Sequence, residues 1–187
     1  CALDEQGPLQ SFRTLYWDCF RDSLVEEPIV RAVALAEPLK IRTISKGPPL
    51  TYFVLKPVQK WLWECLRKHP QFAFIGETFT SEALEEKLLK KCSSNFDWTF
   101  LSGDYSAATD ELHSWVSEEI LEGIAEAVEM PEQFRALIKR ALTQHIFERE
   151  DVNGSVERAS QKRGQLMGSI VSFPFLCIAN AALLELS

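Results

Sequence analysis

The sequence predicts an α+β fold, mostly helical with a small antiparallel sheet. Apolar residues recur at helical spacing through most of the chain, while segments with strand-like alternation are few and short. The 187 residues are 46% hydrophobic and 25% charged, which is enough for one substantial core. The five cysteines are scattered and form no Cys-x-x-Cys pair, so a reducing compartment is expected rather than a disulfide framework or a zinc site.

The predicted helices each carry an apolar stripe with a period near 3.6 residues. In the first of them, Phe12 and Leu15 lie on the stripe and are expected to pack. The second helix is expected to begin at Pro57, because proline suits the first helical position, and Trp61 lies on its core stripe. The predicted ranges are 11–27, 57–66, 81–91, 112–128, 134–142 and 170–184.

The strand predictions rest on alternation and on turn residues. The segment 40–46 alternates and is rich in β-branched residues, and Lys40, Arg42 and Lys46 share one face of it. Three cations on one face suit an exposed edge strand or a bound polyphosphate. The segments 146–150 and 155–158 flank Asn153-Gly154, a pair typical of a β-hairpin turn.

The formal net charge of −7 argues against a nucleic-acid partner, because affinity for phosphate backbones comes largely from Lys and Arg. The charge is unevenly distributed, however. Between Pro38 and Pro70 there are several basic residues, and Glu64 is the acidic one. These residues form either a local basic face or ordinary solvated helix surfaces.

The stretch 101–110 contains two carboxylates with five residues between them. It follows a strand-like run at 96–100, which would place Asp104 at an exposed strand tip within reach of a hard cation. Asp110 falls where the next helix is expected to start, so capping of that helix is its alternative role.

A glycine-rich loop at 161–169 precedes the last predicted helix. Gly164 and Gly168 would let the backbone approach a nucleic-acid strand or a sugar, although an ordinary turn is the alternative. Asn180 is a polar residue within an otherwise apolar helix, so it should face a specific partner. His113 and His145 have no acidic or His neighbour at ligand spacing and are expected to be surface or hydrogen-bonded residues.

These three stretches resemble, in their order, the fingers and palm of viral RNA-directed RNA polymerases. The similarity is closest to the ourmia-like (botourmiavirus) group, which is related to the narnaviruses and leviviruses. It rests on the sequences KIRTISKG at 40–47, SGDYSAATD at 102–110 and GQLMGSIVSFP at 164–174, and it extends over about 37–184. The resemblance implies part of a right-hand polymerase, with a fingers-like region at 1–95 and a palm-like region at 96–187.

The resemblance assigns the phosphate and metal contacts. Lys40 and Arg42, with Lys46 as a helper, would hold the triphosphate of the incoming nucleotide, and the planar fork of arginine suits phosphate oxygens. Asp104 and the main-chain carbonyl of Tyr105 would bind Mg²⁺, with Mn²⁺ as the alternative ion. Two such ions would support in-line nucleotidyl transfer to an RNA 3′-hydroxyl.

The resemblance also assigns ribose and template contacts. Asp110, with Ser172 and Asn180, would read the ribose 2′-hydroxyl and so select ribonucleotides. Gly164 and Gly168 would belong to a flexible loop that adjusts to the template. In many related polymerases the helix asparagine stands four residues after the Ser or Thr, whereas here Leu176 occupies that position.

The implied function is template-directed RNA synthesis from ribonucleoside triphosphates for viral RNA replication. The expected partners are the RNA template and product and the remainder of the polymerase chain, since the start at Cys1 and the uncapped last helix suggest a piece of a longer protein. The apolar run at 170–184 is shorter than the ~20 residues that span a bilayer. The host cytoplasm is the expected location, with the mitochondrion as the alternative.

The 187 residues contain no Gly-Asp-Asp, the family tripeptide that supplies another metal-binding aspartate, so no polymerase activity is expected from this piece alone. Three alternatives stay open: a non-enzymatic helical interaction module, a phosphohydrolase with Asp104 as nucleophile, and an inactive viral remnant in a host genome. The phosphohydrolase would need a second acid two residues on, where Ser106 stands.

Overall fold

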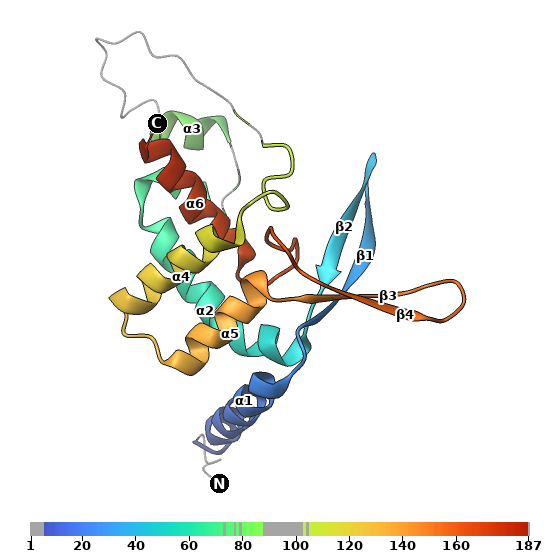
Figure 1. The fold of residues 1–187 in the computed structure, drawn as a ribbon. Coiled ribbons are helices and arrows are strands. Elements are labelled where there is room, and N and C mark those ends of the chain that lie inside the picture. Colours follow the sequence, from blue (N-terminus) through green and yellow to red (C-terminus); the bar gives the residue numbers. More distant parts are fainter. Residues whose placement is uncertain are drawn as a thin grey trace.

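The computed structural model describes residues 6–72, 74–76, 78, 80–87, 103 and 105–186. The helices gather on one side of the molecule, and two β-hairpins project from the other (Figure 1). The predicted strand at 96–100 and the end of the predicted helix at 81–91 lie outside the described residues. The elements in chain order are α1 (Gln6–Val25), β1 (Ile29–Glu37), β2 (Lys40–Lys46), α2 (Pro49–Arg67), the 3₁₀ turn η1 (Pro70–Phe72), α3 (Ser81–Lys87), α4 (Ser114–Ala127), α5 (Glu132–Thr143), β3 (Ile146–Glu150), β4 (Val156–Ser160) and α6 (Ser172–Leu186).

The strands form one mixed sheet with the order β2-β1-β3-β4. Both hairpins are antiparallel, which was predicted for β3 with β4, but β1 and β3 pair in parallel through Ile29 with Ile146 and Val30 with Phe147. The prediction of a wholly antiparallel sheet is therefore wrong at the junction of the two hairpins. Val30 has no exposed surface there, so burial of this side chain accompanies the long-range pairing.

The first hairpin turns at Pro38 and Leu39, where proline suits the first central position of a turn but leucine is unusual at the second. Glu37 pairs with Lys40, and the two residues between them include Leu39 with φ 68°. A left-handed conformation is uncommon for a leucine, and neither Gly nor Asn marks this turn. The strands predicted from the sequence did not include segment 29–36, which the structure shows as β1.

Helix α2 begins eight residues before the predicted start. Pro49 stands in its first turn, and Pro57 lies inside the helix. The carboxylate of Glu26 accepts hydrogen bonds from the backbone N–H groups of Leu50 (3.1 Å) and Thr51 (2.7 Å). Because this carboxylate comes from another segment, it supplies a cap that local sequence could not reveal.

The core draws on both halves of the chain. Helices α1, α2, α4, α5 and α6 all contribute to one cluster of buried apolar residues. The predicted division into a fingers-like region at 1–95 and a palm-like region at 96–187 stays a prediction. The buried members of the cluster are Phe20, Val54, Leu55, Leu62, Leu121, Leu137, Ile138, Ala141, Leu142, Val171 and Phe175.

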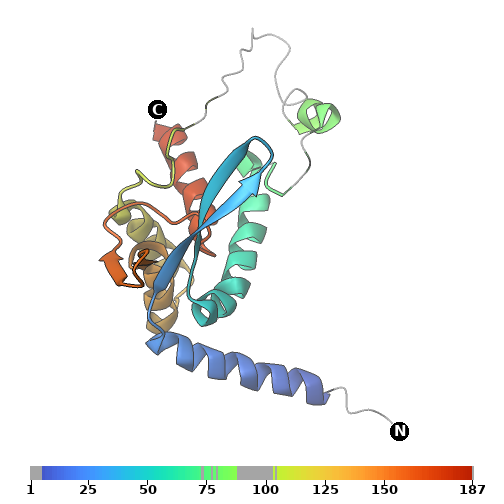
Figure 2. The ribbon, with the colours of Figure 1, turned by 90° about the vertical axis from the view of Figure 1, so that its right-hand side faces the viewer.

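Helix α1 buries only part of its apolar stripe. Phe20 is 5% exposed, whereas Phe12 and Leu15 are 53% and 54% exposed, contrary to the packing predicted for them. The reason is geometric, because the N-terminal part of α1 extends away from the other helices (Figure 2). Among the described residues, every helix is too short or too polar to cross a membrane.

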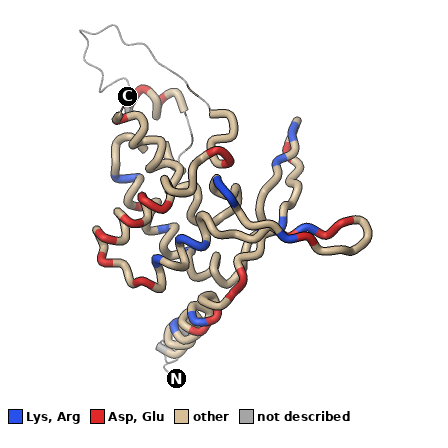
Figure 3. The backbone as a smooth tube through the Cα atoms, viewed as in Figure 1, with Lys and Arg blue, Asp and Glu red and all other residues tan. Residues whose placement is uncertain are grey.

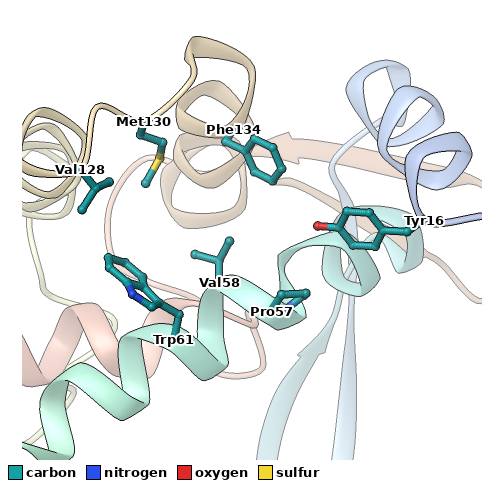
Figure 4. A pocket seen from close by; sticks show the side chains of 7 residues that line it. All are labelled: Tyr16, Pro57, Val58, Trp61, Val128, Met130 and Phe134. Atoms are coloured by element: carbon teal, nitrogen blue, oxygen red, sulfur yellow. The ribbon is translucent and has the colours of Figure 1, made fainter. Parts of the chain in front are cut away.

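An apolar cavity of about 550 Å³ lies between α1, α2 and the turn from α4 to α5 (Figure 4). Trp61 lines it and is 39% exposed, so the prediction that it is a core residue holds only in part. The hydroxyl of Tyr16 donates to the Val54 carbonyl at 2.9 Å. The cavity has no charged side chain in its lining among the described residues, so that lining offers no acid or base chemistry.

The core makes a direct stability prediction. Leu142→Ala removes a side chain with no exposed surface, and the free energy of unfolding should fall by about 2–5 kcal/mol. Leu9→Ala is the matched control, since Leu9 is 64% exposed on α1 and its loss should change stability by less than about 0.5 kcal/mol. Urea unfolding of both variants measures the difference, and equal effects would contradict the assigned core.

Candidate functional site

The glycine loop at 161–169 contacts the segment that contains Asp110. The backbone N–H of Gly164 donates to the Leu112 carbonyl at 2.7 Å, and the N–H of Gln165 donates to the Thr109 carbonyl at 2.8 Å. Gly164 has φ 78°, and a Cβ there would lie 2.7 Å from the carbonyl oxygen of Asp110. Only glycine allows both this backbone conformation and this close approach.

The same loop contacts the strand that contains the predicted phosphate ligands. The N–H of Ser45, in β2, donates to the Met167 carbonyl at 2.7 Å. Gly168 has φ 110°, and a Cβ there would lie 2.5 Å from the Ser45 carbonyl oxygen. The loop thus connects β2 to the Asp110 segment, so stretches far apart in sequence meet at one place.

Buried polar groups hold the loop against α4 and α5. The side-chain amide of Gln161 donates to the carbonyls of Leu142 (3.1 Å) and Gly164 (2.7 Å). Gln165 donates to the Ser117 hydroxyl at 2.8 Å, and the Ser169 hydroxyl donates to the Ala141 carbonyl at 2.5 Å. Sequence reasoning missed these anchoring residues, although the polar residues flanking the two glycines were a signal that it could have used.

His145 belongs to the same anchor. Its Nδ1 lies 2.9 Å from Gln161 Oε1, which is an acceptor, so the neutral ring holds its proton on Nδ1. Its Nε2 is buried without a hydrogen-bond partner among the described residues. Burial lowers the pKa of His145 below its ordinary value, and the bond to Gln161 only partly offsets this.

The predicted phosphate ligands are engaged within their own hairpin. Arg42 Nε donates to Glu37 Oε2 at 2.7 Å, and Lys40 Nζ lies 4.0 Å from the same oxygen. In the register of the hairpin, Lys46 lies opposite Arg31, and these cations share a face with Lys40 and Arg42. The sequence analysis did not single out Glu37, because it predicted no strand before the turn that Glu37 begins.

The two predicted acids differ in what the structure says about them. Asp104 lies outside the described residues, and its metal contact with Tyr105 stays a prediction. Asp110 is exposed and does not cap α4, because that helix begins at Ser114 after His113 as N-cap. The alternative role of Asp110 as a helix cap is therefore wrong, since residues 106–110 form turns before the helix.

The remaining predicted contacts lie on α6. The hydroxyl of Tyr105 donates to Asn180 Oδ1 at 2.9 Å, so Asn180 faces the residue after Asp104. The Ser172 hydroxyl is buried and has no hydrogen-bond partner among the described residues. Within the same residues no group of three or more His, Cys, Asp or Glu side chains could hold a metal ion.

The close approach at Gly164 predicts a specific loss of stability. Gly164→Ala should lower the free energy of unfolding by about 1–2 kcal/mol from the left-handed conformation alone, and further through the contact with Asp110. Gly123→Ala is the matched control. Gly123 lies inside α4, and a Cβ there would meet nothing within 4 Å, so the change should stabilise by about 0.5–1 kcal/mol. Two changes of the same sign in urea unfolding would contradict the loop geometry.

The buried His145 predicts a pH dependence. Its lowered pKa means that the unfolded chain binds the proton more readily than the folded chain, so stability is complete above about pH 6.5 and falls as the pH drops below it. The slope should reach at most about 1.4 kcal/mol per pH unit. Glu118 and Glu148 have pKa values lowered by bonds to Lys139 and Arg31, so their contributions are lost only at lower pH.

Urea unfolding between about pH 7 and pH 5 measures this dependence. His145→Asn removes the titrating group and should give a nearly flat profile over that range. An unchanged slope in the variant would show that another group is responsible.

Comparisons with known proteins show the family of the chain. Residues 31–180 match the family of the Mitovirus RNA-dependent RNA polymerase, a range that includes β2, the Asp110 segment and the glycine loop. The chain is also similar to the RNA-dependent RNA polymerase of Ourmia melon virus (isolate Melon/Iran/VE9), with 31% identity over 164 residues. That match covers 81% of this chain and 19% of the viral protein, so the chain spans about a fifth of its curated relative. No solved structure matches the chain. The chain therefore belongs to the mitovirus RNA-dependent RNA polymerase family, and its predicted resemblance to the ourmia-like viral polymerases is confirmed.

Proposed function

We propose that this chain is the part of a viral RNA-dependent RNA polymerase that binds the incoming ribonucleotide during template-directed RNA synthesis. One observation carries the proposal: the glycine loop makes backbone contacts with both β2 and the Asp110 segment. These contacts bring the cationic strand and one of the two predicted acids to the same loop. A non-enzymatic interaction module would give no reason for this convergence.

The triphosphate would be bound by Lys40, Arg42 and Lys46, which we call the hairpin cations. In the structure Glu37 neutralises Arg42 and lies near Lys40, and all three side chains are about one-third exposed or more. Ion pairs this exposed contribute little to stability, so displacement of Glu37 costs little. A triphosphate carries more negative charge than one carboxylate and offers oxygens that match the arginine fork, so it would compete effectively for these groups.

The acids would have separate roles. Asp104 and the Tyr105 carbonyl would hold Mg²⁺, with Mn²⁺ as the alternative, and carboxylate and carbonyl oxygens are the ligands that these hard ions prefer. When bound, a metal pair activates the RNA 3′-hydroxyl and stabilises the leaving pyrophosphate. The hydrogen bond from Tyr105 to Asn180 would fix the backbone beside Asp104 against α6.

Asp110 would accept a hydrogen bond from the ribose 2′-hydroxyl. Its carboxylate is exposed, and its backbone is packed against Gly164. The Ser172 hydroxyl would assist, since a buried hydroxyl without a partner is uncommon in proteins and often marks a functional site. We further propose the host cytoplasm as the location, in line with the free cysteines Cys19, Cys65 and Cys177.

Primer extension by the complete polymerase tests these roles. Asp104→Asn should lower the rate at least ~1,000-fold, because a bound metal contributes several kcal/mol to transition-state stabilisation. Asp110→Asn should lower the preference for ribonucleotides over deoxyribonucleotides about 10- to 100-fold, the worth of one hydrogen bond to a charged group. Residues 1–187 alone should give no extension.

Asp22→Asn is the matched control, because Asp22 is an exposed carboxylate on α1. It should extend primers at the wild-type rate. Wild-type extension by Asp104→Asn, or an unchanged sugar preference in Asp110→Asn, would overturn the corresponding role.

A further inference from the structure

A second concave surface lies on α2, on a different face from the apolar cavity. It has a volume of about 490 Å³ and is lined only by side chains of this helix among the described residues. We call it the α2 groove, and its lining residues are Lys56, Gln59, Lys60, Trp63, Glu64 and Arg67. Their spacing of three or four residues places them along one helical face.

The cations of the α2 groove have no carboxylate partner among the described residues. Neither Lys60 nor Arg67 lies within 4.0 Å of an acidic oxygen there, and Lys56 Nζ donates to Gln59 Oε1 at 2.6 Å. On the sheet and on α5, in contrast, Arg31, Arg158 and Arg135 are paired with glutamates. Acidic residues gather along α4 and the turn into α5 (Figure 3). The α2 groove is therefore a locally cationic surface on an acidic chain.

Arg67 is held in position by its neighbours. Its guanidinium carbon lies 5.4 Å from the centre of the Trp63 ring, and a Cβ at Gly76 would lie 2.5 Å from its terminal nitrogen. The Trp63 ring is also 5.4 Å from the ring of Phe173, which directly follows Ser172 in α6. The α2 groove thus adjoins the helix that the glycine loop enters, and its arginine lies against the face of an aromatic ring.

We propose that the α2 groove binds the sugar-phosphate backbone of a single RNA strand. The interval from Lys56 to Arg67 is roughly 16 Å along a helix, and this length spans several phosphates. Because Trp63 packs against Arg67 and Phe173, its ring is not free for stacking on a base. Recognition therefore depends on phosphate charge and is independent of base sequence.

The shape and lining of the surface favour RNA over an anionic membrane. A bilayer binds flat or convex faces that insert apolar side chains, whereas this surface is concave and Trp63 is half-buried in it. The choice of RNA among polyanions rests on the proposed function. The binding itself needs neither a nucleotide nor a metal ion, so it can be tested separately from catalysis.

The test measures binding of residues 1–187 to a fluorescein-labelled, unstructured single-stranded RNA by anisotropy in EDTA. Lys60→Gln/Arg67→Gln should weaken binding roughly tenfold at about 0.1 M salt, and the slope of log K against log salt should become shallower by about 1.4, or ~0.7 for each lost contact. Two exposed residues of α1 supply the matched control, Arg13→Gln/Arg21→Gln, which removes the same charge and should leave the slope unchanged.

The charge-preserving variant Lys60→Arg/Arg67→Lys should bind like the wild type. No RNA binding by the wild type, or equal losses in the α2 groove and control variants, would overturn the proposal. So would a loss of binding to phosphatidylglycerol vesicles, in the α2 groove variant, without a loss of RNA binding. Failure of primer extension by the complete polymerase would instead count against the proposed function and leave these binding results unaffected.

Discussion

The arrangement of the site depends on close backbone contact between the glycine loop and its two neighbours. Gly164 and Gly168 both adopt positive φ values, and each approaches a carbonyl oxygen more closely than a side chain would allow. The N–H of Gly164 donates to the Leu112 carbonyl on one side of the loop, and the Met167 carbonyl accepts from the N–H of Ser45 on the other. Because these are backbone contacts, they fix where β2 and the Asp110 segment lie independently of which side chains later bind a ligand.

The contact is stable because the loop is tied to the hydrophobic core from behind. Gln161, Gln165 and Ser169 direct their polar groups at α4 and α5, whose apolar faces form much of the buried cluster. Buried amides and hydroxyls are costly without partners, so satisfying them specifies one loop position. The packed helices α4 and α5 thereby fix the position of the glycine loop at the surface.

Charge on the chain is balanced locally rather than globally. Glu37 pairs with Arg42 and lies 4.0 Å from Lys40, and ion pairs as exposed as these contribute little to stability. The cations of the α2 groove form no ion pair among the described residues, although Glu64 belongs to its lining and the chain has a formal net charge of −7. Net charge is therefore a poor guide to where this protein can meet a polyanion.

The sequence alone determined the features that depend on neighbouring residues: most helices, the strand at 40–46, the hairpin around Asn153-Gly154 and the glycine loop. Its motifs also placed the chain in its family, which the comparisons confirmed. Only the tertiary structure decided the parallel pairing of β1 with β3, the cap that Glu26 gives α2 and the contact of Tyr105 with Asn180. Periodicity and turn chemistry act over a few residues and can be read directly. Contacts between distant segments depend on the tertiary packing of the whole chain, and a local sequence pattern does not specify which segments meet.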